Sequence, residues 1–310
     1  MKNRKRRFHS GILNHCYQNT VNGQLLFYSI SDYLVFFTIL CICASRYGVI
    51  IISVCQMPDH VHIACTASSL DELSCFMRDV FALFAKSDSK VCNRQGQLFN
   101  KSFGSAPKQG AKKARTTIAY IGNNPVERQL CSKAIQYRWN YLAYAQSDCP
   151  FSEKIVIRKA SWEMKQAVNA VKAQHNRRMP LSYAFLQRLF KTLGQKEGLQ
   201  LVDFIVSTYS VIDYDYSGKL FNGIGNMIKA MEYNTGSEYD LNEKNVGRSD
   251  APYARITKWL MGNLKLTDVH DVFALPESRR ADLLLEIHSE LGIEIWQLAK
   301  YLRLEIIREY

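Results

Sequence analysis

The 310-residue sequence lacks the patterns of disulfide-rich, zinc-ribbon and membrane-spanning proteins. None of its nine cysteines forms a CxxC pair, and all nine lie before residue 150, which fits reduced thiols in the cytoplasm. The longest apolar stretch, residues 34–55, is interrupted by Arg46 and Gly48, so each piece is shorter than a membrane span. The basic start is followed by the polar residues 9–23, unlike a secretory leader. We therefore expect a cytoplasmic protein without a membrane partner.

Acidic side chains are scarce in the first half of the chain. Residues 1–150 contain 18 Lys and Arg against 8 Asp and Glu, whereas residues 151–310 contain 22 against 20. The net charge of +12 therefore comes mainly from the first half, which favours a polyphosphate partner. A solubilising surface with a basic arm would carry the same charge, and charge alone does not separate the two. The candidate nucleic-acid contacts are Arg4, Lys5, Arg6, Arg7, Lys101, Lys108, Lys112, Lys113 and Arg115.

The hydrophobic periodicity changes near residue 148. Before it, strand patterns alternate with helix patterns, which predicts an α+β domain with one antiparallel sheet and helices on one face. The expected strands are 12–18, 25–28, 49–57, 60–65 and 98–103, and the expected helices are 32–45, 70–90 and 112–123. Helical patterns fill the rest, so we predict domains at 1–148 and 149–310, the second all-α. Residues 295–304 fit either a truncated helix-turn-helix or an amphipathic packing helix.

Two histidines in one predicted strand carry the first chemical signal. His60 and His62 are two residues apart, so they share one face of the strand at a spacing of about 6.6 Å. Two imidazoles form half of a divalent metal site, and a third ligand must come from elsewhere. The alternative is a pair of half-exposed histidines without a metal, because His-x-His is a weak signal alone. The histidines at 175, 270 and 288 are isolated and are expected at surface or capping positions.

A second signal lies in the predicted helix before Pro125. Tyr120 and Asn124 are four residues apart and therefore share a helix face. Asn124 offers an amide oxygen to a metal, and Tyr120 offers a nucleophilic oxygen beside it. The alternative is a core tyrosine followed by an Asn-Pro helix stop, because proline disfavours helical geometry in the residue before it. That rule predicts that the helix ends at Asn124.

Together these segments resemble the HUH single-tyrosine transposases, in particular the REP-associated and insertion-sequence-200-like branch. Residues 57–62, Met-Pro-Asp-His-Val-His, match the family's Met-Pro-Asn-His-Val-His strand motif, with Asp59 in place of Asn. Residues 120–125, Tyr-Ile-Gly-Asn-Asn-Pro, match its Tyr-Ile-His-Leu-Asn-Pro motif, with Gly122 and Asn123 in place of His-Leu. Residues 96–99, Gly-Gln-Leu-Phe, match its Gly-x-Leu-Phe segment. The resemblance covers roughly residues 9–145.

The resemblance implies a ferredoxin-like HUH domain that cuts and rejoins single-stranded, hairpin-flanked DNA in a bacterial cell. His60, His62 and Asn124 would hold Mg²⁺ or Mn²⁺, and Tyr120 would form a 5′-phosphotyrosine while a 3′-hydroxyl is released. The protein would act as a monomer or homodimer near the nucleoid. One alternative is a domesticated protein that recognises DNA or RNA hairpins without cutting. Another is an HUH nuclease of the relaxase or replication-initiator type.

Overall fold

The sheet has the ferredoxin-like topology that the resemblance to HUH transposases implies. The computed structural model describes residues 7–94, 96–100, 102–233 and 249–304. Its strands β1 (Asn14–Asn19), β2 (Ile50–Met57), β3 (His60–Thr66) and β4 (Gly104–Pro107) are antiparallel and lie in the order β2-β3-β1-β4. Helix α1 (Ile30–Tyr47) connects β1 to β2, and α2 (Leu70–Val91) connects β3 to β4. This βαββαβ order confirms the α+β fold class.

Helix α1 is the central apolar helix of the core. Ser29 and Asp32 cap its N-terminus, and Gly48 ends it in the left-handed conformation that glycine adopts without strain. By length and composition α1 is the one helix among the described residues that qualifies as a membrane span. In the fold, however, 67% of its apolar window is buried, and it packs against α2 and the later helices α5 and α6. That is the environment of a core helix.

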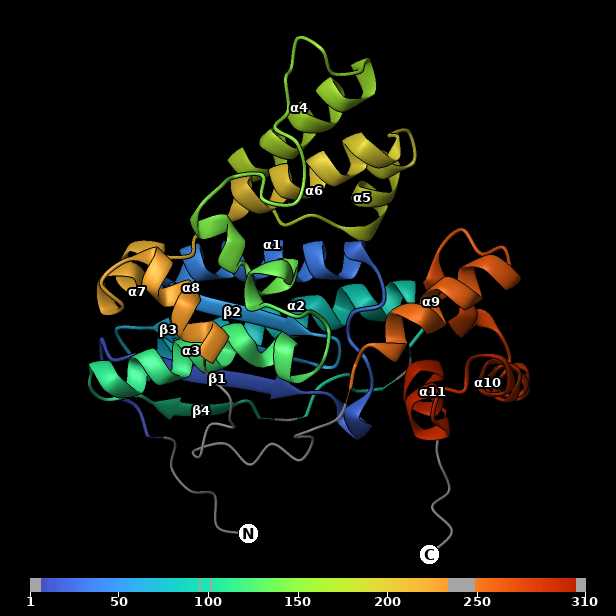
Figure 1. The fold of residues 1–310 in the computed structure, drawn as a ribbon, viewed down its shortest axis with the longest axis horizontal. Helices are drawn as coiled ribbons and strands as arrows, with labels where there is room; N and C mark the ends of the chain where they lie inside the picture. Colours follow the sequence, from blue (N-terminus) through green and yellow to red (C-terminus); the bar gives the residue numbers. More distant parts are fainter. Residues whose placement is uncertain (1–6, 95, 101, 234–248, 305–310) are drawn as a thin grey trace, which may run out of the picture.

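A third helix, α3 (Ala111–Glu127), lies on the opposite face of the sheet from α1, so the expectation of helices on one face holds for α1 and α2 and not for α3. The side chain of Gln56 on β2 donates to the Tyr33 carbonyl of α1, and Gln56 is paired with Val61, so Val61 shares the α1 face. His62 has the opposite orientation and contacts Asn124 of α3. In Figure 1, α1 lies above the strands and α3 is drawn across them, at the level of β3 and β1. The sheet therefore has one apolar face under α1 and one face bearing histidines under α3.

Three sequence predictions of local structure are wrong. Residues 25–28 form a loop whose Leu25 and Tyr28 are buried, and the fourth strand is 104–107 rather than 98–103. At Gly104, β4 approaches β1 so closely that any Cβ would overlap the ring of Tyr17. Glycine at this position therefore permits the pairing. Helix α3 also continues past Asn124, with Pro125 inside its last turn. Proline has no N–H, so the helix continues through Pro125 without the hydrogen bond that this position would otherwise make to the Ile121 carbonyl.

The second half of the chain is helical and packs in three places. Helices α4 (Trp162–Asn176), α5 (Tyr183–Phe190) and α6 (Gln195–Tyr209) lie over α1, while α7 (Tyr214–Leu220) and α8 (Ile224–Tyr233) lie against α3 (Figure 1). Helices α9 (Pro252–Asn263), α10 (Glu277–Leu291) and α11 (Ile295–Leu302) form a separate core with Leu25 and Tyr28. Short 3-10 turns occur at Val21–Gly23, Ala134–Gln136, Arg138–Asn140, Leu142–Ala145 and Val269–Ala274.

We call α9, α10, α11 and the Val269–Ala274 turn the C-terminal unit. A recognition helix following α11, as a helix-turn-helix would require, would fall on residues 305–310, outside the described residues. The amphipathic alternative for this segment agrees with the burial of Leu298 and Leu302 in the core of the unit.

His270 is not the surface or capping residue that its isolation in the sequence suggests. It is buried, with Nε2 at 3.0 Å from Asp32 Oδ1 and Nδ1 at 2.6 Å from Asp268 Oδ1. The same Asp32 caps α1 and accepts a hydrogen bond from the Tyr183 hydroxyl at 2.6 Å. Burial alone would lower the pKa of His270, but the carboxylates of Asp32 and Asp268 raise it to about 10. This ion pair therefore links the C-terminal unit to α1.

We predict that this link stabilises the fold most below about pH 6.5, the pKa of an unfolded histidine, and that the stabilisation is lost as the pH rises through 10. Over that range the unfolded chain releases the proton first, so stability falls with pH. His270→Gln should lower the free energy of unfolding near neutral pH by about 3 kcal/mol, because Asp32 keeps a buried charge without its partner. Urea unfolding across this range measures both effects.

The matched control is His288→Gln, because His288 lies in the same unit and contacts the carbonyl oxygen of Ile293 rather than a carboxylate. It should leave the pH dependence unchanged. Parallel stability curves for the wild-type and His270→Gln proteins would contradict the assignment.

Candidate active site

Strand β3 and helix α3 bring the four predicted chemical residues together. The rings of His60 and His62 have centroids 4.8 Å apart and are nearly perpendicular. The amide nitrogen of Asn124 lies 3.3 Å from His62 Nε2, and the Tyr120 ring centroid lies 5.6 Å from that of His62. The helical spacing of Tyr120 and Asn124 places both on the side of α3 that faces the histidines. We refer to these four residues as the candidate site.

A fifth residue, His15, belongs to the same cluster and was missed by the sequence reasoning. Its Nε2 lies 3.0 Å from His62 Nδ1, and its ring centroid lies 6.0 Å from that of Tyr120. Tyr17 lies directly opposite His62 in the β1–β3 register, so His15, two residues away on β1, shares that face. A histidine inside the predicted strand 12–18 was the available signal. Its use required knowing that this strand pairs with β3.

Both ring nitrogens of His62 are therefore engaged, one by His15 and the other by Asn124. Burial lowers the pKa of His62 well below its ordinary value, and the neighbouring His60 and His15 lower it further. A neutral imidazole has one N–H and one lone pair. If Nδ1–H donates to His15 Nε2, the Nε2 lone pair faces Asn124.

A buried charge network borders the site at the β2–β3 turn. Asp59 Oδ1 lies 2.5 Å from His60 Nδ1, and its Oδ2 lies 2.5 Å from Lys300 Nζ and 3.6 Å from Arg128 Nη2. Asp250 lies 3.3 Å from the Nε of Arg128. Burial alone would raise the pKa of Asp59, but its contacts with His60, Lys300 and Arg128 lower that pKa below its ordinary value. Asp59 is therefore a carboxylate at neutral pH.

The residues fit a divalent cation by their donor types. Among the described residues there is no group of three or more His, Cys, Asp or Glu side chains arranged for a metal, so a site here needs an amide ligand. His60 Nε2 is buried and has no hydrogen-bond partner within the described part of the chain. Rotating the Asn124 amide by half a turn would present its oxygen where its nitrogen now faces His62. Two imidazoles and an amide oxygen form a ligand set suited to such an ion.

Access to the site is limited in this conformation. Tyr120 is 2% exposed and His62 is 1% exposed. A phosphate reaches Tyr120 only if the side chains over it move. Any chemistry on a large substrate therefore requires local opening.

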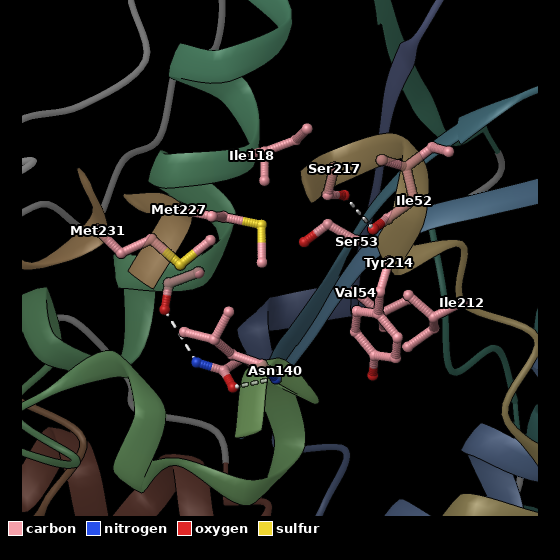
Figure 2. Close-up of a pocket in the computed structure, with 12 residues that line it drawn as sticks. Ile52, Ser53, Val54, Ile118, Asn140, Ile212, Tyr214, Ser217, Met227 and Met231 are labelled. Carbon is pink, nitrogen blue, oxygen red and sulfur yellow. Dashed lines mark hydrogen bonds between the residues drawn. The ribbon is translucent and has the colours of Figure 1, made fainter. Parts of the chain in front are cut away.

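A small cavity on another flank of α3 is part of the packing and not a second site. It lies between β2, α3, α7 and α8 and has a volume of about 10 Å³, roughly the space of one water. Figure 2 shows Met227 and Met231 of α8 beside Ile118 of α3, with Asn140 nearby. A Cβ on Gly122 would overlap Met231, so this glycine permits the close contact of α8 with α3.

The candidate basic contacts separate into three groups. Arg4, Lys5, Arg6 and Lys101 lie outside the described residues, whereas Arg7, Lys112, Lys113 and Arg115 are exposed. Lys108 is 2% exposed, which corrects the expectation that it belongs to the exposed cluster. It follows β4 directly, and its backbone N–H donates to the Leu13 carbonyl at 2.7 Å, which keeps this residue against the sheet. The exposed basic residues of α3 lie at its first turns.

The fold and the site define a class: a ferredoxin-like α+β protein with a His-x-His strand facing a Tyr-x-x-x-Asn helix. No family model and no curated protein matches the chain. Among solved structures, it is similar to a REP-associated tyrosine transposase bound to a REP hairpin, at 17% sequence identity and a TM-score of 0.39. The similarity covers 45% of this chain and 81% of that one.

The charge network predicts a pH dependence at Asp250. Burial, together with the charge of Asp59, raises the pKa of Asp250 to about 6. An unfolded aspartate has a pKa of about 3.9, so between these values the unfolded chain loses its proton first and stability falls as the pH rises. Asp250→Asn does not ionise and should gain stability relative to wild type from about pH 4 to pH 7, by on the order of 1–3 kcal/mol.

Urea unfolding of both proteins across this pH range measures the change. The slope of the difference with pH is decisive, because the lost contact with Arg128 also alters its absolute value. A difference that stays constant with pH would show that Asp250 ionises normally.

Proposed function

We propose that this protein is a metal-dependent DNA strand transferase that cuts and rejoins single-stranded, hairpin-flanked DNA through Tyr120. The observation that carries the proposal is the position of His62. Its Nε2 lies 3.3 Å from the Asn124 amide nitrogen, and its ring centroid lies 4.8 Å from that of His60 and 5.6 Å from that of Tyr120. His62 and Tyr120 are 58 residues apart in the sequence, and their meeting in one place supports their joint use.

His60, His62 and Asn124 would hold the cation, Mg²⁺ or Mn²⁺. When bound, the cation supplies neutralisation of charge on the scissile phosphate. The residues themselves are suited to this task because both imidazoles come from one rigid strand. Asn124 faces them from a helix that packs on the same sheet.

Tyr120 supplies the nucleophile. Its phenol oxygen attacks phosphorus, the new O–P bond forms, and the bond from phosphorus to the 3′ oxygen breaks. The phenolic proton leaves with solvent or the departing oxygen, which becomes a 3′-hydroxyl. Because the phosphotyrosine retains the energy of the phosphodiester, the reverse attack by a 3′-hydroxyl rejoins DNA without an external energy source.

The basic residues of the first half support a DNA partner. Lys112, Lys113 and Arg115 are exposed on the helix that carries Tyr120, so phosphate contacts there would place a strand along α3. We expect the protein to act in the bacterial cytoplasm, associated with the nucleoid. It would bind DNA in this way as a monomer or as a homodimer.

One observation favours a second candidate, a hairpin-binding protein that does not cut. Tyr120 and His62 are almost inaccessible in this conformation, and a binding protein needs neither of them exposed. The two functions differ in one measurement. Only the transferase forms a covalent DNA adduct.

The histidines should be required for cleavage and not for binding. We predict that His60→Ala or His62→Ala abolishes cleavage of labelled single-stranded hairpin DNA in Mn²⁺. DNA affinity should change little, because it comes from many Lys and Arg contacts and should fall steeply with salt. The control is His175→Ala, because His175 lies on α4 and packs against Tyr209. Full cleavage by the His60→Ala protein would count against the scheme.

The nucleophile can be tested against a close competitor. Tyr17 lies opposite His62 in the sheet and is the matched control for Tyr120. Tyr120→Phe removes one oxygen and keeps the ring, so we predict an intact fold, intact binding and no covalent adduct, whereas Tyr17→Phe should still form it. Denaturing the reaction and mapping the DNA-linked peptide identifies the residue. An adduct on Tyr17, or one that persists in Tyr120→Phe, would make Tyr120 a core residue.

A further inference from the structure

Asp59 links the candidate site to a part of the chain far away in sequence. One carboxylate oxygen lies 2.5 Å from His60 Nδ1, and the other lies 2.5 Å from Lys300 Nζ on α11. Asp59 is itself buried, so solvent does not replace either contact. His60 is thus connected, through one side chain, to the C-terminal unit.

The Lys300 end of this connection is held firmly. Helix α11 belongs to the second core, which includes Leu25 and Tyr28 from the first half of the chain. The Tyr28 hydroxyl donates to the Tyr301 carbonyl at 3.3 Å, and the Arg303 guanidinium lies 5.2 Å from the Tyr28 ring centroid. Lys300 therefore reaches Asp59 from a packed helix and not from a loose chain end.

A second contact restrains Asp59 from another direction. Arg128, just after α3, lies 3.6 Å from the Asp59 oxygen that also contacts Lys300. Asp250, just before α9, lies 3.3 Å from Arg128. The carboxylate therefore has cations on one oxygen and the imidazole on the other. The orientation of the Asp59 carboxylate toward His60 is therefore set by Arg128, at the end of α3, and by Lys300, on α11.

The chemical consequence concerns which nitrogen of His60 carries the proton. A carboxylate at Nδ1 favours a proton there, which leaves the lone pair on Nε2. Nε2 is the buried atom for which the described residues provide no hydrogen-bond partner. The lone pair is thus directed to a position where the described residues provide no donor and a cation could bind.

We propose that Asp59 is a positioning residue that fixes the tautomer and orientation of His60, and that the C-terminal unit completes the site by holding Asp59 through Lys300. The cation-binding part of this inference rests on the proposed function. The tautomer part does not. The second half of the chain is then a component of the site and not an appended module.

Histidine-ring nitrogen NMR of the metal-free, full-length protein tests the tautomer directly. The His60 signals are assigned by their loss in His60→Gln. Wild type should show a proton on Nδ1. Asp59→Asn should show the same, because its amide oxygen can still accept this hydrogen bond, whereas Asp59→Ala should lose the preference.

Lys300→Met should shift the tautomer population in the same direction as Asp59→Ala, by a smaller amount. It also keeps the test decisive if Asp59→Ala fails to fold. The control is Arg279→Met, which removes an exposed ion pair with Glu286 in the same unit and should leave His60 unchanged. An unchanged His60 signal in Asp59→Ala would overturn the positioning role, and one in Lys300→Met would overturn the part of the C-terminal unit.

Mn²⁺ titration of the same proteins tests the consequence for the ligand. Asp59→Ala should weaken Mn²⁺ binding by about 10- to 100-fold, as loss of a ligand's hydrogen-bond partner typically does, and Asp59→Asn should restore most of it. Lys300→Met should give a smaller loss. Tighter Mn²⁺ binding by Lys300→Met would overturn the proposal, because it would show that Lys300 acts only as a repelling charge.

The two readouts separate the two levels of inference. A wild-type protein that fixes the His60 tautomer and does not bind Mn²⁺ would refute the metal-dependent function and leave the positioning role in place. Equal Mn²⁺ affinities of the wild-type and Asp59→Ala proteins would refute the positioning role alone.

Discussion

Strand β3 must satisfy two different environments at once, and the rest of the structure depends on this constraint. Val61 and Ile63 are buried in the core on the side of α1. His60 and His62 alternate with them and therefore face α3. A shift of one residue in register would put imidazoles in the apolar core and the apolar side chains against α3. The pairing of β3 with both β1 and β2 prevents this, and it also fixes where α3 must lie.

Burying the histidine face costs free energy unless its polar atoms have hydrogen-bond partners. His62 meets this requirement with His15 on one nitrogen and Asn124 on the other. His60 meets it at Nδ1 through Asp59 and leaves Nε2 without a partner among the described residues. A buried polar atom in that state needs an explanation, and a ligand is the simplest one in a site with this donor set.

The C-terminal unit is tied to the ferredoxin-like domain by charge contacts as well as by apolar packing, and two of these contacts lie close to the candidate site or the core helix. His270 pairs with Asp32 at the start of α1, and Lys300 pairs with Asp59 at the start of β3. Buried ion pairs contribute less to stability than to a defined geometry, because desolvation offsets much of their attraction. These two pairs would therefore matter most for where the unit sits. That position is next to the candidate site.

Local patterns in the sequence determined the main elements and the chemical candidates. Strand alternation identified His60 and His62, helical spacing linked Tyr120 with Asn124, and capping residues placed α2, because each of these signals depends on neighbours in the chain. Tertiary structure alone decided the rest. The contact of His15 with His62 depends on strand register. The burial of Lys108 depends on its position at the edge of the sheet. The contact of Lys300 with Asp59 depends on the packing of a helix that is distant in sequence. Periodicity reports which face of an element is apolar, but not which other element will cover it.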